Sequence, residues 1–396
     1  MTAFEGATLD PMWSASPLAT LDKLCADATR ATRVLPALVA VNAAGERARL
    51  TRAVAAGESP TPRWEIERRS IDAGLRRALG SGRRWVELAR GHALADLYAA
   101  RLDELELDVA MIESLGQGSI VRPLAARRYG TGAEIVTHAG RAQPLAEVAR
   151  QILELARVDD EPRELPADGG PSSMAGALRV AVIAAGLSVE VRVEPRLGAG
   201  AAAGDRTVFV ASRRFGRREC VRLVAHEVLG HAVAAANGAH HPLRLVETGT
   251  ADSFADQEGT AIALEEAAGA LDASRWRVLA ARVVATDRMH AGASFGETAR
   301  ELHRDLALPV DVAVVTAERA YRGGGVARDA GYLTGYLRVR AALERGEVTL
   351  DELRMGRVSV GAVHTLRALA FEPPHQPNTE IVLARVRTAI AGPRAA

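Results

Sequence analysis

The amino-acid sequence predicts an α+β fold that is mostly helical, with a small antiparallel or mixed sheet and a helical N-terminal region. Long segments carry apolar residues at three- and four-residue spacing, the pattern of amphipathic helices, from residue 16 to about residue 157 and again from Arg217 to about Ala370. Between these segments lie short runs of β-branched residues separated by glycine-containing turns, a pattern typical of strands.

The helical segments suggest two regions. The stretch from Trp64 to Leu107 has the pattern of an amphipathic helical pair, and the stretch from Arg157 to Met174 is rich in Pro, Gly, Asp and Ser, as linkers are. We therefore expect a helical N-terminal region over residues 1–160 and a second region over residues 175–396, or one continuous domain. The expected strands are Val180–Ile183, Ser188–Val193 and Thr207–Ala211.

The bulk composition excludes several classes of protein. Hydrophobic residues make up 48% and charged residues 25% of the 396 residues, as in ordinary globular proteins, and the net charge of +1 gives no reason to expect nucleic-acid or membrane-surface binding. Cys25 and Cys220 are too few for a disulfide framework. Without a leader-like segment or an apolar run long enough to span a bilayer, a cytoplasmic protein is expected. Lys23 is the only lysine beside many arginines, which we interpret as the codon bias of a GC-rich bacterial genome.

One segment carries recognisable chemistry. The run Cys220–Asn237 is apolar on one side and precedes Gly238, a good C-cap residue, so it is predicted to be a helix. It contains His226, Glu227 and His231. Neutral imidazoles bind Zn²⁺, and a carboxylate beside the first histidine can take a proton from the water that the metal activates. The segment therefore predicts a zinc metallopeptidase with two histidine ligands and a glutamate base.

The spacing of the histidines requires a distorted helix. At about 3.6 residues per turn, residues at i and i+5 point about 140° apart. His226 and His231 can reach one ion only if the helix takes up an extra residue, for instance as a π-bulge. Gly230 lies where that distortion is needed and has the conformational freedom to permit it. The alternative is an apolar helix that carries these residues without binding a metal.

A catalytic zinc site also needs a third protein ligand and an open position for water. The carboxylates that follow the motif are Glu247, Asp252, Asp256, Glu258, Glu265 and Glu266. A second helix is predicted to begin at Asp256, with Glu258 in its first turn, where a helix–loop–helix return can bring it against the first helix. Glu265 and Glu266 are expected at the surface or as partners of an imidazole N–H. Spacing alone leaves this choice open.

The segment from His226 to Ala261 resembles the QEGLA-motif family of metallopeptidases, whose animal members are the microtubule-associated tyrosine carboxypeptidases. The resemblance is carried by His-Glu-x-x-x-His, Asn237-Gly238, Pro242-Leu243, Gly249 and Glu258-Gly259-Thr260-Ala261. In that family both histidines and the glutamate before the glycine bind zinc, and the glutamate beside the first histidine is the base. The resemblance thus implies that His226, His231 and Glu258 bind Zn²⁺ and that Glu227 is catalytic, within a zincin-like catalytic core.

The resemblance extends to Arg319–Gly323 and Ala327–Gly335, and it has departures. Leu229-Gly230 stands where the family usually has Gly-Thr, Arg328 replaces a lysine, and Thr260 replaces an apolar residue. The Leu-Gly form is similar to dipeptidyl-peptidase III, a much larger zinc peptidase that matches nowhere else.

A carboxypeptidase must recognise a terminal carboxylate, for which arginine has the best geometry. Arg322 and Arg328 are the candidates, with Tyr332 and Tyr336 as hydroxyl donors near the reacting carbonyl, although both arginines can also be read as solvated surface residues. The run Thr207–Ala211 is a candidate edge strand for pairing with a substrate backbone. We expect a zinc carboxypeptidase that acts on a C-terminal aromatic residue of a peptide or protein. The alternatives are a zinc-binding regulatory protein without turnover and a zinc amidohydrolase acting on a small substrate.

Overall fold

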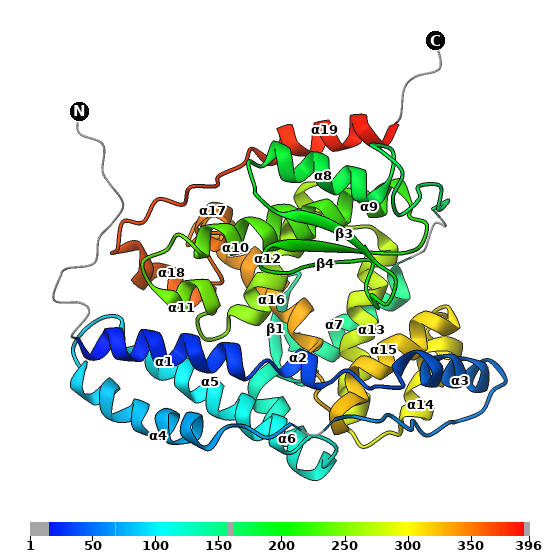
Figure 1. Cartoon of the computed structure of the whole chain (residues 1–396). Helices are drawn as coiled ribbons and strands as arrows, with labels where there is room; N and C mark the ends of the chain where they lie inside the picture. Colours follow the sequence, from blue (N-terminus) through cyan, green and yellow to red (C-terminus); the bar gives the residue numbers. More distant parts are fainter. Residues whose placement is uncertain (1–15, 68, 157–160, 392–396) are drawn as a thin grey trace. The chain divides into compact units, whose positions relative to one another are not determined.

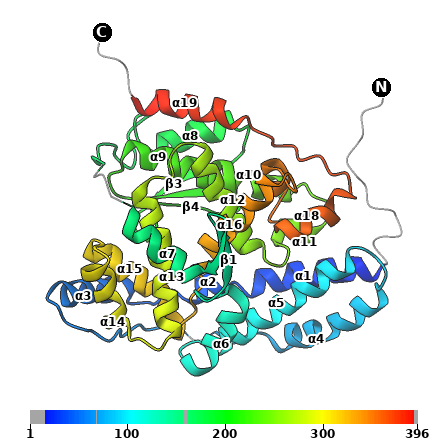
Figure 2. The same ribbon diagram turned by 180° about the vertical axis from the view of Figure 1, so that it is seen from behind.

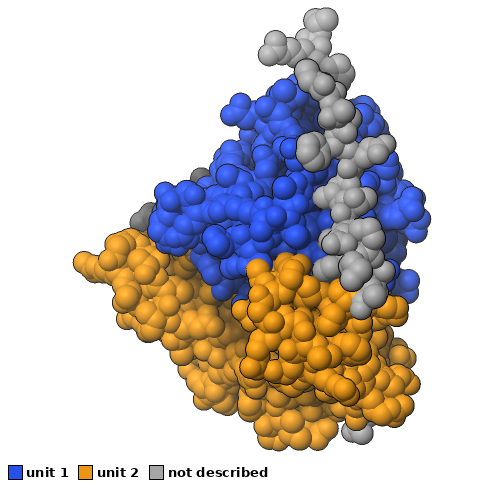
Figure 3. Space-filling model, turned by 90° about the vertical axis from the view of Figure 1, so that its left-hand side faces the viewer, with its two compact units in different colours: residues 1–13, 158–272, 338–396 blue, residues 14–157, 273–337 orange. Residues whose placement is uncertain are grey.

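The computed structural model describes residues 16–67, 69–156 and 161–391. Within them the chain is mostly helical, with a two-stranded and a three-stranded sheet, so the predicted α+β class is confirmed (Figure 1). By its internal contacts the chain forms two compact units, coloured separately in Figure 3. The first unit comprises the described residues of 158–272 and 338–396, and the second those of 14–157 and 273–337. No helix in the described ranges is long and apolar enough to cross a lipid bilayer.

The second unit consists of helices and one hairpin. Three of its helices, α1, α4 and α5, pack against one another and lie side by side in both ribbon views (Figures 1 and 2). Its N-terminal elements are α1 (Pro17–Ala31), α2 (Val34–Ala37), α3 (Ala43–Ala55), α4 (Ala73–Leu88), α5 (Ala95–Glu113), α6 (Gly118–Tyr129), β1 (Ile135–His138), β2 (Arg141–Pro144) and α7 (Leu145–Leu155). Its later elements are α13 (Ala273–His290), α14 (Phe295–Arg300), the π-helix η3 (Glu301–Asp305), α15 (Val310–Tyr321), the 3₁₀-helix η4 (Arg322–Gly324) and the first part of α16 (Ala330–Glu344).

The predicted helical pair is present, but it begins later than expected. The described residues between Trp64 and Asp72 are not helical, and α4 begins at Ala73, where Asp72 caps its first turn by accepting a hydrogen bond from the Leu75 N–H at 3.1 Å. The hairpin β1–β2 was not predicted. Its strands are short and half exposed, and its turn at Ala139-Gly140 has positive φ at both residues, so periodicity alone gives little signal for it.

The first unit contains the three-stranded sheet, in the order β3–β5–β4. Strand β5 pairs in parallel with β3 and antiparallel with β4, so the sheet is mixed. The elements of this unit are α8 (Met174–Ala184), β3 (Glu190–Glu194), β4 (Ala201–Ala203), β5 (Thr207–Ala211), α9 (Arg217–Leu223), the π-helix η2 (Val224–Ala232), α10 (Val233–Gly238), α11 (Arg244–Thr248), α12 (Ser253–Ala267), the end of α16, α17 (Leu350–Leu353), α18 (Val360–Arg367) and α19 (Thr379–Ala391).

Two of the three predicted strands are confirmed, and one prediction was wrong. The run predicted at Ser188–Val193 forms β3, and Thr207–Ala211 forms β5. The run Val180–Ile183 lies in helix α8, whose first turn is capped by Ser173 accepting from the Gly176 N–H at 3.0 Å. The buried residues Met174, Leu178, Ala181 and Val182 recur at three- and four-residue spacing, so one helical face packs into the core. Tertiary packing thus outweighed the β propensity of this run.

The helix that carries His226, Glu227 and His231, hereafter the motif helix, is buried in the core of the first unit. Helix η2 packs against α12, α8 and β4, and α8 also packs against α19 and β3 (Figure 1). One hydrophobic cluster joins these elements and includes residues on both sides of the motif, such as Val224, Val228 and Val233. The segment with His226, Glu227 and His231 is thus built into the core rather than onto a surface loop. The expected division into residues 1–160 and 175–396 is a prediction that these contacts do not test.

Candidate metal centre

The two histidines lie on one continuous helical segment, α9–η2–α10, whose middle part is a π-helix over Val224–Ala232. A π-helix closes its hydrogen bonds at i+5, so residues five apart return to the same side. The Nε2 atoms of His226 and His231 accordingly lie 3.3 Å apart. The helical distortion expected from the spacing is confirmed, and it spans nine residues rather than a single bulge.

Gly230 has a different role from the one predicted. Its φ is not positive, so the helix does not use glycine's conformational freedom there. It uses the missing side chain: a β-carbon at position 230 would lie 3.1 Å from Ala261 Cβ and 3.3 Å from Ala261 Cα. Gly230 therefore permits close packing of η2 on α12, the helix that carries Glu258.

A buried arginine supports the π-helical turn. Arg354, 4% exposed, donates a hydrogen bond from Nη1 to the Leu229 carbonyl at 3.1 Å. Its own carbonyl accepts a hydrogen bond from Asn237 Nδ2 at 2.8 Å. The arginine is linked in this way to two points of the motif helix. Sequence reasoning missed it, because nothing near position 354 resembles a metal site.

Glu258 completes a three-residue cluster with the two histidines. Helix α12 begins at Ser253, three residues before the predicted start, which puts Glu258 in its second turn. Glu258 Oε2 lies 3.3 Å from His226 Nε2 and 3.7 Å from His231 Nε2. One ligand atom from each of the three residues lies within 4.8 Å of the others, and this triad is the cluster of metal-ligand type found among the described residues.

A second carboxylate on α12 orients the first histidine. Glu265, fully buried, accepts a hydrogen bond from His226 Nδ1–H at 2.7 Å, a tautomer assigned from this contact. His226 Nε2 is thereby directed toward the triad, as in metal sites whose imidazoles are held by an outer carboxylate. Glu266 instead faces outward, 3.4 Å from Arg340. The sequence analysis had not decided whether Glu265 and Glu266 lie at the surface or support an imidazole N–H.

The charges of the triad are mutually stabilised. Burial lowers the pKa of His226, but its contacts with Glu258 and Glu265 outweigh burial and raise that pKa to about 9. Burial raises the pKa of Glu258, yet the two neighbouring histidines hold it well below its usual value. A cation held between these groups would replace the proton of His226 as the positive charge that stabilises the Glu258 carboxylate.

Glu227, the predicted base, is buried beside the sheet. Its Oε2 accepts a hydrogen bond from the Ala203 N–H of β4 at 2.8 Å. Strand β4 is at the edge of the sheet and β5 is its central strand, so the prediction that Thr207–Ala211 is an edge strand was wrong. The central position follows because β5 pairs with β3 on one side and with β4 on the other.

The residues of this centre fit a zinc ion. Two imidazole nitrogens and one carboxylate are the donor set of catalytic zinc sites, which keep a fourth position open. Glu258 Oε2 is buried and accepts no hydrogen bond of proper geometry from any described residue, the state expected of an oxygen that a cation would bind. Another of the candidate carboxylates, Asp256, is bound by Arg338 at 2.6 Å and by the Val360 N–H at 2.8 Å.

The four predicted substrate residues lie in the second unit, whereas the triad lies in the first. Arg328 Cζ lies 5.8 Å from the centroid of the Tyr129 ring, and Tyr332 lies under Arg282, whose Cζ is 4.6 Å from its ring centroid. Tyr336 is fully buried and packs edge-on against Trp276. Arg322 is half-buried at the start of η4. Their role in substrate binding stays a prediction.

Comparison with known proteins identifies a family. The family model described as microtubule-associated tyrosine carboxypeptidase matches residues 54–375. Among solved structures, a protein described as a lipoprotein from Colwellia psychrerythraea is similar, with 15% identity and a TM-score of 0.39. The alignment covers 79% of this chain and 56% of that chain, so the chain spans little more than half of its length. No curated protein matches the chain significantly.

Proposed function

The chain belongs to the microtubule-associated tyrosine carboxypeptidase family, and from this premise we propose that it is a zinc-dependent carboxypeptidase that removes a C-terminal aromatic residue from a peptide or protein. Membership of the family implies a peptidase of the carboxypeptidase type. The observation that carries the zinc proposal is the convergence of His226, His231 and Glu258. The burial of His226 and its support by Glu265 are what a preorganised metal centre requires.

The residues around the triad have distinct tasks in hydrolysis. Zinc held by His226, His231 and Glu258 would supply a Lewis acid for the scissile carbonyl and lower the pKa of water at its open position. Glu227 is oriented through one oxygen, Oε2, which accepts from the Ala203 N–H. Its other oxygen, Oε1, takes a proton from the attacking water and delivers it to the leaving amine.

The hydrogen bond from the Ala203 N–H to Glu227 Oε2 also supports the proposal of a zincin-like core. The motif helix packs against the mixed sheet, and edge strand β4 contacts the base through its Ala203 N–H. An edge strand offers unpaired backbone groups to which a peptide can add as a further strand. In this proposal the substrate backbone pairs with β4.

Metal content and a single isosteric substitution test the proposal. Protein purified without a histidine tag should carry about one zinc ion per chain and hydrolyse a peptide that ends in a free tyrosine carboxylate, but not the same peptide with an amidated C-terminus. Glu227→Gln keeps an oxygen that can accept from Ala203 and should keep the zinc, while kcat falls by about 10²–10⁴-fold. Glu266→Gln, an exposed glutamate on α12, is the matched control and should leave kcat unchanged.

The outcomes separate this proposal from its alternatives. Bound zinc without hydrolysis of any peptide would favour a regulatory protein that keeps the fold without turnover. Hydrolysis of small amides, with equal rates for free and amidated peptide C-termini, would favour an amidohydrolase. Full activity of Glu227→Gln with zinc bound would show that the assigned base is wrong. We also propose four side chains of the second unit as contacts of the substrate: Arg322, Arg328, Tyr332 and Tyr336.

A further inference from the structure

Arginine side chains from two helices of the second unit converge on one buried carboxylate. Asp329, 1% exposed, accepts hydrogen bonds from Arg319 of α15 at both of its oxygens. Arg282 of α13 approaches the same group, with Nε 3.6 Å from Oδ2. The ring of Tyr332 lies beneath these guanidinium groups, 4.6 Å from Arg282 Cζ and 5.9 Å from Arg319 Cζ. Asp329 is therefore committed to two arginines.

Arg322, close to this group, has a guanidinium edge without a partner. Its Nε and Nη2 atoms are buried and donate no hydrogen bond to any residue in the described ranges. The carboxylates whose charges act most strongly on it are Asp329 and Glu318. Glu318 is bound by Arg47 through hydrogen bonds of 2.7 and 2.9 Å. Both nearby carboxylates thus already serve other arginines.

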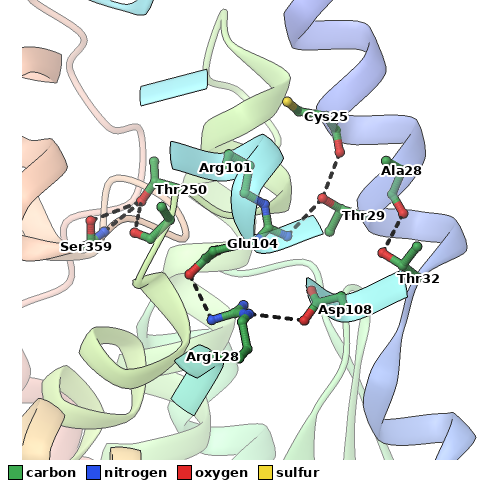
Figure 4. A network of polar contacts seen from close by, with 11 residues as sticks. Cys25, Ala28, Thr29, Thr32, Arg101, Glu104, Asp108, Arg128, Thr250 and Ser359 are labelled. Carbon is green, nitrogen blue, oxygen red and sulfur yellow. Dashed lines mark hydrogen bonds and ion pairs between the residues drawn. The ribbon is translucent and has the colours of Figure 1, made fainter. Parts of the chain in front are cut away.

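Another buried ion network in the same unit shows the usual arrangement (Figure 4). Arg128 Nη1 lies 2.8 Å from Glu104, and Arg128 Nε donates to Asp108 at 3.1 Å. Matching of this kind is expected, because a buried N–H without a partner costs about 1–3 kcal/mol and more when the group is charged. At Arg322, burial and then repulsion from Arg319 lower the pKa to about 10.

The backbone on which Arg322 stands is firmly held. The three residues after it, Gly323, Gly324 and Gly325, all have positive φ, at 69°, 90° and 116°. The Gly323 carbonyl accepts from the Gly116 N–H at 2.9 Å, and the Gly324 carbonyl accepts from Arg122 Nε at 3.2 Å. A β-carbon at Gly324 would lie 3.2 Å from the Gly116 backbone. This close turn positions Arg322 before any ligand arrives.

We propose that the Nε–Nη2 edge of Arg322 is a binding site for a carboxylate group in the second unit. The two parallel N–H groups of this edge match the two oxygens of a carboxylate, which Lys cannot reproduce. Arg282 adds positive charge and has a buried Nη1 without a hydrogen-bond partner among the described residues. Asp329 is a positioning residue that orders Arg319 and Arg282. A bound carboxylate satisfies the donors that the chain leaves unpaired.

Two sources can supply this carboxylate: the C-terminus of a peptide substrate, or a small free carboxylate. Only the first source rests on the proposed carboxypeptidase function. The site itself does not, so its test must not depend on turnover.

The test measures binding to full-length, zinc-loaded Glu227→Gln protein by isothermal titration calorimetry. The probes are acetate, a short peptide that ends in a free tyrosine carboxylate, and the same peptide with a C-terminal amide. Adding Arg322→Met should weaken binding of a carboxylate probe by about tenfold or more, the worth of one charge-assisted hydrogen bond. Arg322→Lys should also bind more weakly, because it keeps the charge and loses the fork. Arg90→Gln, at a 76% exposed arginine of the same unit, is the control and should not change binding.

Thermal stability without ligand provides a second readout. Removal of an uncompensated buried charge should leave the melting temperature of Arg322→Met unchanged or higher, whereas loss of a structural ion pair would lower it.

The probes distinguish the two sources. If the free-acid peptide binds more tightly than the amide, and Arg322→Met abolishes the difference, the ligand is a peptide C-terminus. If both peptides bind alike and only acetate is weakened, the ligand is a small carboxylate. The proposal is overturned if both Arg322 variants bind every carboxylate probe within about twofold of the parent, or if the parent binds none. Absence of peptidase activity would refute the proposed function while leaving the acetate result decisive for this site.

Discussion

The substitution Gly230→Ala tests whether close packing of η2 on α12 sets the geometry of the metal centre. The added β-carbon would lie 3.1 Å from Ala261 Cβ and 3.3 Å from Ala261 Cα. Carbon atoms in ordinary contact are about 3.5–4.0 Å apart, so the helices must separate by about half an ångström. Zinc-ligand distances tolerate only about 0.2 Å. Glu258 lies one turn before Ala261 on α12, so the displacement reaches the ligand.

The expected result is weaker zinc binding rather than unfolding. Overpacking costs about 1–3 kcal/mol, but the substitution also removes a mid-helix glycine, which is worth about 1 kcal/mol in the other direction. Net stability should therefore fall by about 0–2 kcal/mol, which is too little to unfold the protein. Zinc affinity should fall by about 10–100-fold, the loss seen when the support of a ligand is disturbed. Competition for zinc with a chromophoric chelator measures this affinity.

Two further variants test the reasoning. Gly361→Ala adds a methyl group to an exposed helical glycine of the same unit, where a β-carbon meets nothing within 4 Å, and should leave zinc affinity unchanged. Gly230→Ala combined with Ala261→Gly removes the shorter contact, with Ala261 Cβ, and should recover part of the affinity, at a cost of about 1 kcal/mol of stability. Wild-type zinc affinity in Gly230→Ala, or no recovery in the double variant, would refute the packing argument.

The remaining predictions concern the supporting residues. Glu265→Gln replaces the charged acceptor of the His226 N–H and should weaken zinc binding by about 10–100-fold in the chelator assay; an unchanged affinity would show that this contact does not orient the ligand. Arg354→Met leaves the Leu229 carbonyl without its side-chain donor and should lower the free energy of unfolding in urea by about 1–3 kcal/mol; an equal unfolding midpoint would contradict this. Although burial raises the pKa of Asp329, neighbouring arginines lower it to about 2. Because this pKa is depressed on folding, the stability that the ionised carboxylate contributes is present above its ordinary pKa of 3.8 and is lost as the pH falls toward 2; urea titrations over this range should show a slope that Asp329→Asn reduces.

Much of the candidate centre was predictable from local sequence. The apolar run Cys220–Asn237 indicates a helix, and His226, Glu227 and His231 on that run indicate metal chemistry. The need for a helical distortion follows from helix geometry, because two side chains at i and i+5 cannot share an ion on an ideal α-helix. The structure shows this distortion as η2.

Other features of the fold were not accessible to local patterns. Val180–Ile183 carries β-branched residues in a row, yet the cap at Ser173 and burial of one face make it part of helix α8. The edge position of β4 was missed because a run of three alanines, Ala201–Ala203, has no strand propensity. Strand order depends on pairing across the sheet, which a single strand does not encode.

By itself, the sequence determined the residue types of the candidate metal centre, the helix that carries two of them and the helical distortion that their spacing requires. Spacing alone left the downstream carboxylate open, and the family resemblance implied Glu258. Only the tertiary structure showed that Glu258 lies beside both histidines, that Gly230 is needed for space, and that Arg354 supports the turn. The physical reason is the distance along the chain: Glu265 and His226 are separated by 39 positions, and Arg354 and Leu229 by 125. Periodicity and spacing report on neighbours within a few turns, whereas these contacts form only when separate helices pack into one core.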